Sequence, residues 1–442
     1  MDLVADRIKS GDLHLFSLVS NCFIFDPTTN SVFSLPKEDF DLIKSGSIDL
    51  KLSEEIKQAT QNGFFSSLDD SSFEDTRVFK SLCLIITSKC NFACSYCFEK
   101  ENSNPPAEPD VMSFEVGQKA LDLIIRLSSK RQNIEVDFFG GEPLLFFETV
   151  KQIVEYGRAI EPMYKKKFWF SLTTNASLVT EAVVDFLQKE NISLILSIDG
   201  SEKNHNRYRT YRDGSGTFLE TWKGIQKVID SGHSGYYTRG TYTKVTPDFV
   251  NQVLYLFSQG IKQISFEPVV SKDKDIGFTF EDLPKIKKQY EELAEEYIKK
   301  KAEKPELAFY HFEVSLEEGA CRQKLMTSCG AGVEYLSVSP SGKLYPCHQF
   351  DGKKEFELGD VYLGVENKEL VEKLRGLTMV THKEKCKTCW ARYLCGGGCL
   401  ANNLTINGDL EQVYEMGCEI QKIRLESAIY VQTKLKELEN HR

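Results

Sequence analysis

The sequence predicts an α/β protein whose central part is a parallel β-sheet closed wholly or partly into a barrel. From Leu82 onward, short apolar runs alternate with amphipathic helical segments, which is typical of parallel strands joined by crossover helices. The chain has thirteen cysteines. All of them except Cys22 and Cys83 fall at residues 90–97 and 321–418, with a long cysteine-free stretch between these two groups. We therefore expect a catalytic barrel with one cysteine group near its start and a metal-rich segment after it.

The composition is that of a globular protein, since 41% of the 442 residues are apolar and 27% are charged. A net charge of -10 argues against nucleic acid or an anionic membrane as the main partner, because both attract basic surfaces. No apolar run is long enough to span a bilayer, and the N-terminus lacks the apolar core of a signal peptide. We expect a cytoplasmic protein, in which thiols stay reduced and grouped cysteines indicate metal binding rather than disulfides.

Six strands are expected in the barrel. The strand candidates are residues 83–87, 134–140, 168–175, 193–200, 236–244 and 263–269, and the helix candidates include residues 113–130, 181–191 and 217–232. A long charged helix is expected at residues 281–306, where the charges are interpreted as a solvated face.

A smaller domain is expected before the barrel. Residues 13–36 contain apolar runs on either side of a turn sequence, and two short helices are expected at residues 37–46 and 53–63. The polar stretch at residues 66–76 is typical of a linker. Because few buried contacts need to cross a linker, we expect this domain to be separable from the barrel.

Three cysteines directly after the first barrel strand form a C-x3-C-x2-C run. Cys90, Cys94 and Cys97 can share one metal centre, but a closed zinc site and a four-iron cluster each need four ligands. One interpretation is a zinc site completed by a distant residue. The other is an iron-sulfur cluster with one iron open to an external ligand, carried by the first loop at the catalytic face of the barrel.

A family resemblance favours the second interpretation. The cysteine run resembles the cluster motif of radical S-adenosylmethionine (SAM) enzymes, in which the amino and carboxylate groups of SAM complete the cluster. Four later segments resemble motifs of this family in the same order: FFGGEP at residues 138–143, SLTTNA at 171–176, LSIDG at 196–200 and HNRYRTYRDGSGTF at 205–218. Each of them taken alone is also typical of a turn or a helix cap.

The resemblance implies a 4Fe-4S cluster on the three cysteines and a set of contacts with SAM. Glu142 is expected to bind the methionine amino group and Arg209 the carboxylate, with Arg207 and Arg212 close by in the sequence. The implied contacts are Tyr96 through its backbone, Gly140 and Gly141 as a backbone edge open to the ligand, Glu142, Thr174, Asn175, Ser197, Asp199 and Arg209.

The C-terminal cysteines resemble the SPASM domain of radical SAM enzymes that act on ribosomal peptides. The resemblance implies a first auxiliary cluster on Cys321, Cys329, Cys347 and Cys399 and a second on Cys386, Cys389, Cys395 and Cys418, which makes three 4Fe-4S clusters in all. Two zinc sites would use the same eight cysteines, but only iron has a redox state that can accept an electron from a product radical. Cys22 and Cys83 are interpreted as buried apolar cysteines, and this is also the alternative for Cys321.

The part before the barrel resembles the winged-helix leader-recognition domain (RRE or PqqD-like) of peptide-maturation enzymes, which binds a leader peptide as an added strand at a sheet edge. Residues 31–36 are the candidate edge, and the alternative is a packing extension without a ligand. The implied domains are leader recognition at residues 1–78, a partial (β/α)6 TIM-like radical SAM barrel at 79–305, a SPASM domain at 306–425 and a C-terminal helix at 426–442.

The segments around the SPASM cysteines are most similar to maturases of the ranthipeptide (SCIFF) type, which install thioether crosslinks. The implied activity is an oxidoreductase in which a 5′-deoxyadenosyl radical takes a hydrogen from an acceptor residue, a substrate cysteine sulfur bonds to that carbon, and an auxiliary cluster takes the surplus electron. The implied partners are a cysteine-containing precursor peptide with a leader and a reducing donor such as flavodoxin or ferredoxin. The alternatives are another radical crosslink, formylglycine formation as in anaerobic sulfatase maturases and, remotely, a non-catalytic metal-binding scaffold.

Overall fold

The computed structural model divides into two compact units. Residues 1–75, 278–328 and 376–442 belong to unit 1, and residues 76–277 and 329–375 belong to unit 2. The residues described within them are 7–8, 10–46, 75–98, 109–246, 248–316 and 326–440. In this part of the chain no helix is both long enough and apolar enough to cross a bilayer.

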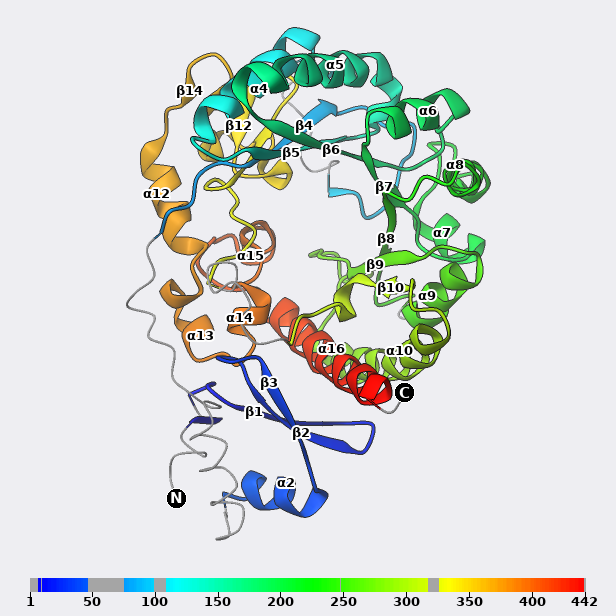
Figure 1. Ribbon diagram of the computed structural model, residues 1–442, viewed down its shortest axis with the longest axis vertical. Coiled ribbons are helices and arrows are strands. Elements are labelled where there is room, and N and C mark those ends of the chain that lie inside the picture. Colours follow the sequence, from blue (N-terminus) through cyan, green and yellow to red (C-terminus); the bar gives the residue numbers. More distant parts are fainter. Residues whose placement is uncertain are drawn as a thin grey trace. The chain divides into compact units, whose positions relative to one another are not determined.

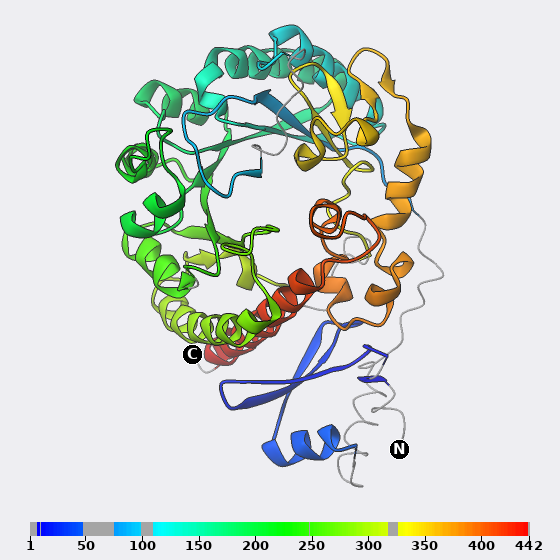
Figure 2. The same ribbon diagram turned by 180° about the vertical axis from the view of Figure 1, so that it is seen from behind.

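Unit 2 contains the six parallel strands that the sequence predicts, and they neighbour one another in sequence order. The strands are β4 (Ser81–Thr87), β5 (Asn133–Gly140), β6 (Lys167–Thr174), β7 (Ser193–Ser197), β8 (Tyr236–Tyr242) and β9 (Gln263–Pro268). The helices on the convex side of the curved sheet are α4 (Phe114–Leu127), α5 (Phe147–Tyr164), α6 (Glu181–Lys189), α7 (Glu202–Tyr208), α8 (Phe218–Asp230) and α9 (Phe249–Ser258) (Figures 1 and 2). All six strands therefore end at one edge, where the connecting loops can share a site.

Four short strands extend this sheet beyond β4 and make it a mixed sheet. They are β11 (Tyr335–Val338), which is parallel to β4, and the antiparallel strands β12 (Lys343–Tyr345), β13 (Gly359–Asp360) and β14 (Gly364–Val365). Two 3-10 turns, η6 (His348–Phe350) and η7 (Lys354–Phe356), and helix α12 (Lys368–Leu377) complete this segment. Residues 329–375 thus continue the barrel sheet and cover what would otherwise be an open edge at β4.

The two faces of the sheet differ in chemistry. Phe138 of β5 and Phe170 of β6 stack at 5.6 Å on the helix side, and Gly157 of α5 leaves room for the Phe170 ring, since a Cβ there would lie 2.7 Å from it. Because successive side chains of a strand alternate between faces, Asp137 and Ser171 lie on the opposite, concave face. The apolar face forms the core, and the concave face carries polar groups.

Unit 1 combines an N-terminal sheet with helices from the C-terminal part. The antiparallel strands β1 (His14–Leu18), β2 (Asn21–Asp26) and β3 (Ser31–Leu35) are followed by α2 (Lys37–Lys44), as predicted, whereas the helix predicted at residues 53–63 lies outside the described residues. The other elements are η4 (Phe280–Asp282), α10 (Leu283–Glu303), β10 (Ala308–Phe309), η5 (Tyr310–Phe312), η8 (Val380–His382), α13 (Glu384–Lys387), α14 (Arg392–Cys395), α15 (Leu400–Asn407) and α16 (Glu415–Asn440). Helices α10 and α16 run side by side (Figure 1).

One expectation about unit 1 needs correction. The C-terminal helix begins at Glu415 rather than at residue 426, so that Cys418 lies on it. The N-terminal sheet packs on other parts of unit 1, because His14 stacks on Trp390 at 3.8 Å and bonds to Glu426 at 2.9 Å, whereas its separability from the barrel stays a prediction. The polar composition of residues 66–76 carried no information about these contacts, which come from residues that precede it.

Candidate functional site

The cysteine loop, residues 88–98, begins where β4 ends, at the edge where the parallel strands end. The loop has little regular structure of its own, and its backbone bonds to a segment that follows α7. The Ala93 N–H donates to the Thr210 carbonyl (2.7 Å), and the Ser95 N–H donates to the Tyr208 carbonyl (2.9 Å). Neighbouring segments thus hold the loop, which is half-buried at its three cysteines.

The three thiols of the loop are close enough to influence one another. Burial, with smaller contributions from Glu142, Cys94 and Cys97, raises the pKa of Cys90 to about 12, against a hydrogen bond (3.4 Å) that the Phe92 N–H donates to the Cys90 sulfur. Three thiolates here need a compensating positive charge, which an iron centre would supply. Among the described residues no three His, Cys, Asp or Glu side chains converge on one ion, whereas a four-iron cluster binds each thiolate at a separate iron. The donor set fits the predicted cluster.

The two glycines after β5 bring that strand's end against the cysteine loop. The Gly141 N–H donates to the Thr87 carbonyl (2.7 Å), and the Glu142 N–H donates to the Lys89 carbonyl (2.9 Å). A Cβ on Gly140, which has φ of 122°, would lie 2.3 Å from the Thr87 oxygen, and one on Gly141 would lie 2.2 Å from the Lys89 oxygen. The described close approach is therefore to the chain's own backbone, and an approach to a ligand stays a prediction.

Glu142 connects this turn to the end of β6. The side chain is fully buried; Oε1 accepts from the Thr174 hydroxyl (2.7 Å) and the Leu144 N–H (3.1 Å), and Oε2 accepts from the Asn175 N–H (2.8 Å). Burial raises the pKa of Glu142 to about 7 even though all three donors lower it. Both carboxylate oxygens have partners within the chain, so a direct bond to the SAM amino group stays a prediction.

Asn175 extends this network to the first cysteine. Its Nδ2 donates to Asn91 Oδ1 (2.9 Å) and lies 3.9 Å from the Cys90 sulfur, while its Oδ1 accepts from the Ser177 hydroxyl (2.6 Å). Asn91 closes a ring of bonds by donating to Ser177 Oγ (2.9 Å). Sequence reasoning missed Asn91 and Ser177, although Asn91 stands inside the cysteine motif itself.

A second network lies beside Cys94. The guanidinium of Arg209 donates twice to Asp199, at 3.0 Å and 3.2 Å, and Asp199 also accepts from the Tyr96 hydroxyl and from the Thr241 N–H (2.9 Å). The Arg209 charge lowers the pKa of the Cys94 thiol, although burial is the larger effect and raises it. The structure thus brings together three of the predicted SAM residues, which come from three separate segments.

A neutral histidine supports the ion pair from behind. His205 Nδ1 accepts from the Asp199 N–H (3.4 Å), so its Nε2 carries the proton and donates to Thr217 Oγ1 (3.1 Å). The Thr217 hydroxyl in turn donates to the Arg209 carbonyl (2.8 Å). Burial lowers the pKa of His205 to about 4, which keeps the ring neutral. Neither His205 nor Thr217 was assigned a role from the sequence.

The other candidates near Arg209 lie in different surroundings. Arg207 and Arg212 are exposed, and Arg209 is the arginine of the three that pairs with Asp199. Ser197 is the last residue of β7 and pairs in register with Arg239 of β8. The arrangement supports the register that placed Arg209 in the site.

The concave face of the sheet carries further polar side chains below the cysteine loop. Asp137 accepts from the Ser171 hydroxyl (2.8 Å), and burial raises the pKa of Asp137 to about 7 against Ser171, the positive charge of Arg239 and a further hydroxyl. His348 lies against Phe139 with ring centroids 4.6 Å apart. These groups offer both charge and hydrogen bonding to a polar substrate.

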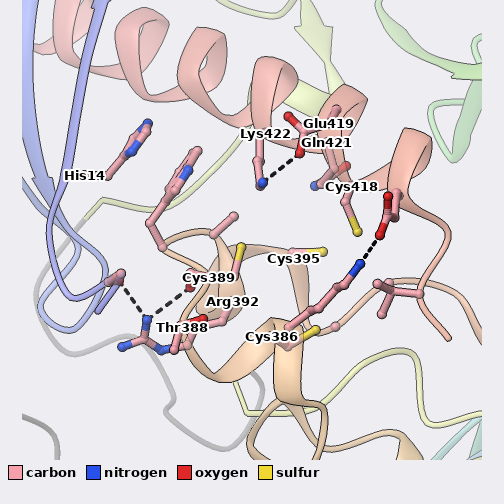
Figure 3. A pocket seen from close by; sticks show the side chains of 18 of the residues that line it. His14, Cys386, Thr388, Cys389, Arg392, Cys395, Cys418, Glu419, Gln421 and Lys422 are labelled. Atoms are coloured by element: carbon pink, nitrogen blue, oxygen red, sulfur yellow. Dashed lines mark hydrogen bonds and ion pairs between the residues drawn. The ribbon is translucent and has the colours of Figure 1, made fainter. Parts of the chain in front are cut away.

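The four cysteines predicted for the second auxiliary cluster all lie in unit 1 and line one cavity of about 540 Å³ (Figure 3). They are Cys386, Cys389, Cys395 and Cys418. Burial, together with the other three thiols, raises the pKa of Cys418 to about 11. As in the cysteine loop, four mutually repelling thiolates fit a cationic iron centre.

The set predicted for the first auxiliary cluster stays a prediction. Cys321 lies outside the described residues, and Cys329 and Cys347 belong to unit 2, whereas Cys399 belongs to unit 1. Cys22 and Cys83 are 5% and 0% exposed, which confirms their interpretation as buried apolar residues.

Comparison with known families agrees with this geometry. The model of the family described as the radical SAM superfamily matches residues 84–267, which run from β4 to β9 and include the cysteine loop. The match covers the six parallel strands and the loop that carries the cysteine motif, so this part of the chain is similar to a radical SAM domain.

Two relatives match about three quarters of this chain. The antilisterial bacteriocin subtilosin biosynthesis protein AlbA of Bacillus subtilis is 23% identical over 73% of this chain and 67% of its own length. The cysteine-type anaerobic sulfatase-maturating enzyme of Clostridium novyi is 23% identical over 73% of this chain and 89% of its own length.

Other relatives match a shorter region. The chain spans 65% of an uncharacterized protein of Methanocaldococcus jannaschii, at 30% identity over 44% of this chain. It spans 39% of the radical SAM cyclopropyl synthase TigE of Paramaledivibacter caminithermalis, at 25% identity over 41% of this chain.

Two solved structures share the fold. The structure described as native anSMEcpe with bound AdoMet covers 82% of this chain and 100% of its own, with a TM-score of 0.65 and 22% identity. Streptococcus suis SuiB bound to its precursor peptide SuiA covers 91% of this chain and 97% of its own, with a TM-score of 0.50 and 17% identity.

Replacing Arg209 with alanine is expected to destabilise the protein strongly. The change leaves Asp199 buried without its charged partner, which typically costs about 3–5 kcal/mol of unfolding free energy. Denaturant unfolding of the cluster-free protein measures the loss, with Arg207→Ala as the matched control because Arg207 is exposed. Equal stability of the two variants would contradict the described pair.

Asp137 is expected to make stability depend on pH. Its pKa is about 7 in the folded protein against an ordinary value of 3.8, so the ionised form is disfavoured by folding. The contribution of Asp137 to stability should therefore fall as pH rises from about 4 to about 7 and stay level above that. The wild type should lose unfolding free energy over this range and Asp137→Asn should not, so the unfolding free energy of the variant should rise relative to that of the wild type as pH increases. The exposed control Asp185→Asn should track the wild type; if both variants behave alike, Asp137 is not the source.

Proposed function

We propose that this chain is a radical SAM peptide maturase that forms thioether bonds between substrate cysteine sulfurs and carbon. The observation that carries the radical SAM chemistry is the pair of polar networks that flank the cysteine loop. One reaches the Cys90 sulfur through Asn175, and the other acts on Cys94 through Arg209. When bound at this loop, a cluster and SAM supply a 5′-deoxyadenosyl radical, which removes a hydrogen atom from the substrate.

In this proposal the chain's own residues bind and orient SAM between the two networks. Glu142, Thr174 and Asn175 are on one side of the loop, and Tyr96, Asp199 and Arg209 are on the other. Gly140, Gly141 and Ser197 would complete the contacts. Buried charges act strongly on a zwitterionic ligand, because little water screens them.

Thioether formation releases an electron, and a cluster held by the auxiliary cysteines would accept it. Joining a thiol to a C–H carbon removes one hydrogen atom, which goes to the radical, and then one proton and one electron. A redox-active cluster can take this electron. The second set of cysteines in their shared cavity supports such a site, and we propose Cys321, Cys329, Cys347 and Cys399 for the first.

Peptide recognition is proposed for the N-terminal sheet. Strand β3 is an edge of the order β1-β2-β3, which suits addition of a leader strand along residues 31–36. Two similar proteins support a peptide substrate: AlbA is a bacteriocin biosynthesis protein, and SuiB has been solved bound to its precursor peptide SuiA. The proposed domains are 1–78, 79–305 and 306–425, with the C-terminal helix beginning inside the last of them at Glu415. The proposed electron donor is a flavodoxin or ferredoxin.

Formylglycine formation is the second candidate. It is favoured by the sulfatase-maturating enzyme of C. novyi, 89% of which this chain covers. The two functions differ in their product, because a thioether retains the substrate sulfur in the peptide and formylglycine formation leaves an aldehyde in its place.

Reconstituted protein is expected to hold about twelve irons per chain, in three four-iron clusters. The triple variant Cys90→Ala, Cys94→Ala, Cys97→Ala should lose only about four irons, because its remaining cysteines still bind the auxiliary clusters. It should also lose all SAM cleavage, because the cluster that binds SAM is gone. Iron analysis and 5′-deoxyadenosine assay measure both, with Cys22→Ala as the control that removes a cysteine without loss of iron. SAM cleavage by the triple variant would rule out the radical SAM site.

The product should distinguish the two candidate functions. Incubation of the holoenzyme with SAM, a low-potential reductant and a cysteine-containing precursor encoded beside the gene should give a peptide that has lost two hydrogens per crosslink. Mass spectrometry should also find that the crosslinked cysteines resist alkylation, because their sulfurs no longer carry a proton. An aldehyde that reacts with hydrazides, on a peptide whose cysteine sulfur is gone, would contradict thioether formation and support the second candidate.

A further inference from the structure

The cavity of the second auxiliary set has a wall that comes from the opposite end of the chain. Besides the four cysteines, Gly11, Leu13, His14 and Leu15 line the cavity, and all of these residues belong to unit 1. Figure 3 shows His14 and the labelled cysteines bordering the same space. We call residues 11–14 the cap segment.

The cap segment packs directly on the backbone that carries the first two cysteines of this set. Gly11 has φ of 73°, and a Cβ there would lie 2.0 Å from the carbonyl oxygen of Thr388, which stands between Cys386 and Cys389. Arg392 donates to the carbonyls of both Gly11 (2.7 Å) and Cys389 (3.0 Å). One buried guanidinium thus joins the cap segment to a cysteine of the set.

Arg392 makes a further ion pair with Asp12 of the cap segment, at 2.6 Å. At the other end of the cap segment, His14 stacks on Trp390 with ring centroids 3.8 Å apart and the planes within 5°. Its Nε2 bonds to Glu426 (2.9 Å) on α16, the helix that carries Cys418. The cap segment therefore contacts both parts of the chain that supply cysteines to the cavity, residues 386–395 and helix α16.

We propose that the cap segment shields the second auxiliary cluster from water and so sets its reduction potential. The inference rests on the proposed function, in which these four cysteines hold a cluster. A cluster held by four thiolates is anionic and gains negative charge on reduction, which water stabilises. Shielding by the cap segment therefore lowers the potential. Strand β1 begins at His14. The cap segment at the proposed electron acceptor is therefore continuous with the sheet that we propose binds the leader.

Redox titration followed by electron paramagnetic resonance tests this in the background Cys90→Ala, Cys94→Ala, Cys97→Ala, where the SAM cluster is absent. Gly11→Ala should displace the cap segment, since the added methyl group meets the Thr388 carbonyl. His14→Ala removes the ring that stacks on Trp390 and leaves the sequence of the cysteine segment unchanged. Both should raise the midpoint potential of the second cluster and speed its loss in air. His14→Phe, which restores stacking, should return the potential toward that of the background protein.

Trp222→Ala, which removes an indole from α8 in unit 2, is the control and should change neither quantity. Unchanged potentials in Gly11→Ala and His14→Ala, with iron content retained, would overturn the role of the cap segment. A failure of the proposed function gives a different result: replacing Cys386, Cys389, Cys395 and Cys418 by alanine would then leave the iron content unchanged.

Discussion

The cysteine loop is irregular, so its neighbours must hold its three thiols in fixed places. Two buried carboxylates, Glu142 and Asp199, organise these neighbours through hydrogen bonds. Glu142 accepts three hydrogen bonds, two of which join the turn after β5 to the end of β6 while the third comes from the turn itself. Asp199 accepts from Arg209, Tyr96 and the Thr241 N–H. Buried carboxylates are stable only with such partners, and the partners of Asp199 come from three different segments. The carboxylates therefore fix the ends of several strands relative to the cysteines.

The sequence allowed the barrel and the residue types of the site to be predicted. The six parallel strands have apolar runs that alternate with helical patterns, and this signal is local. The short strands β11 to β14 were not foreseen, because their pairing with β4 joins residues far apart in the chain and each strand is too short to show a period. Cys90, Glu142, Asp199 and Arg209 were found because motifs contain them.

The missed residues share one property. His205, Thr217, Asn91 and Ser177 act by hydrogen bonds to other site residues, and although three of them stand inside the quoted motifs, a motif does not reveal which neighbours a side chain bonds to. The same reason explains why the contacts of the N-terminal sheet within unit 1 were not foreseen. Composition identified a polar stretch as a linker, but the stack of His14 on Trp390 and the bonds of Arg392 are long-range contacts that only the folded chain reveals.

The central claim is that radical chemistry at the cysteine loop acts on a peptide, and isotope transfer tests it most directly. The holoenzyme would be incubated with SAM, reductant and a precursor peptide deuterated on its non-cysteine residues. If the peptide is the substrate of the radical, deuterium will appear in 5′-deoxyadenosine in step with modification of the peptide. Formation of 5′-deoxyadenosine without deuterium, while the peptide is modified, would contradict the account.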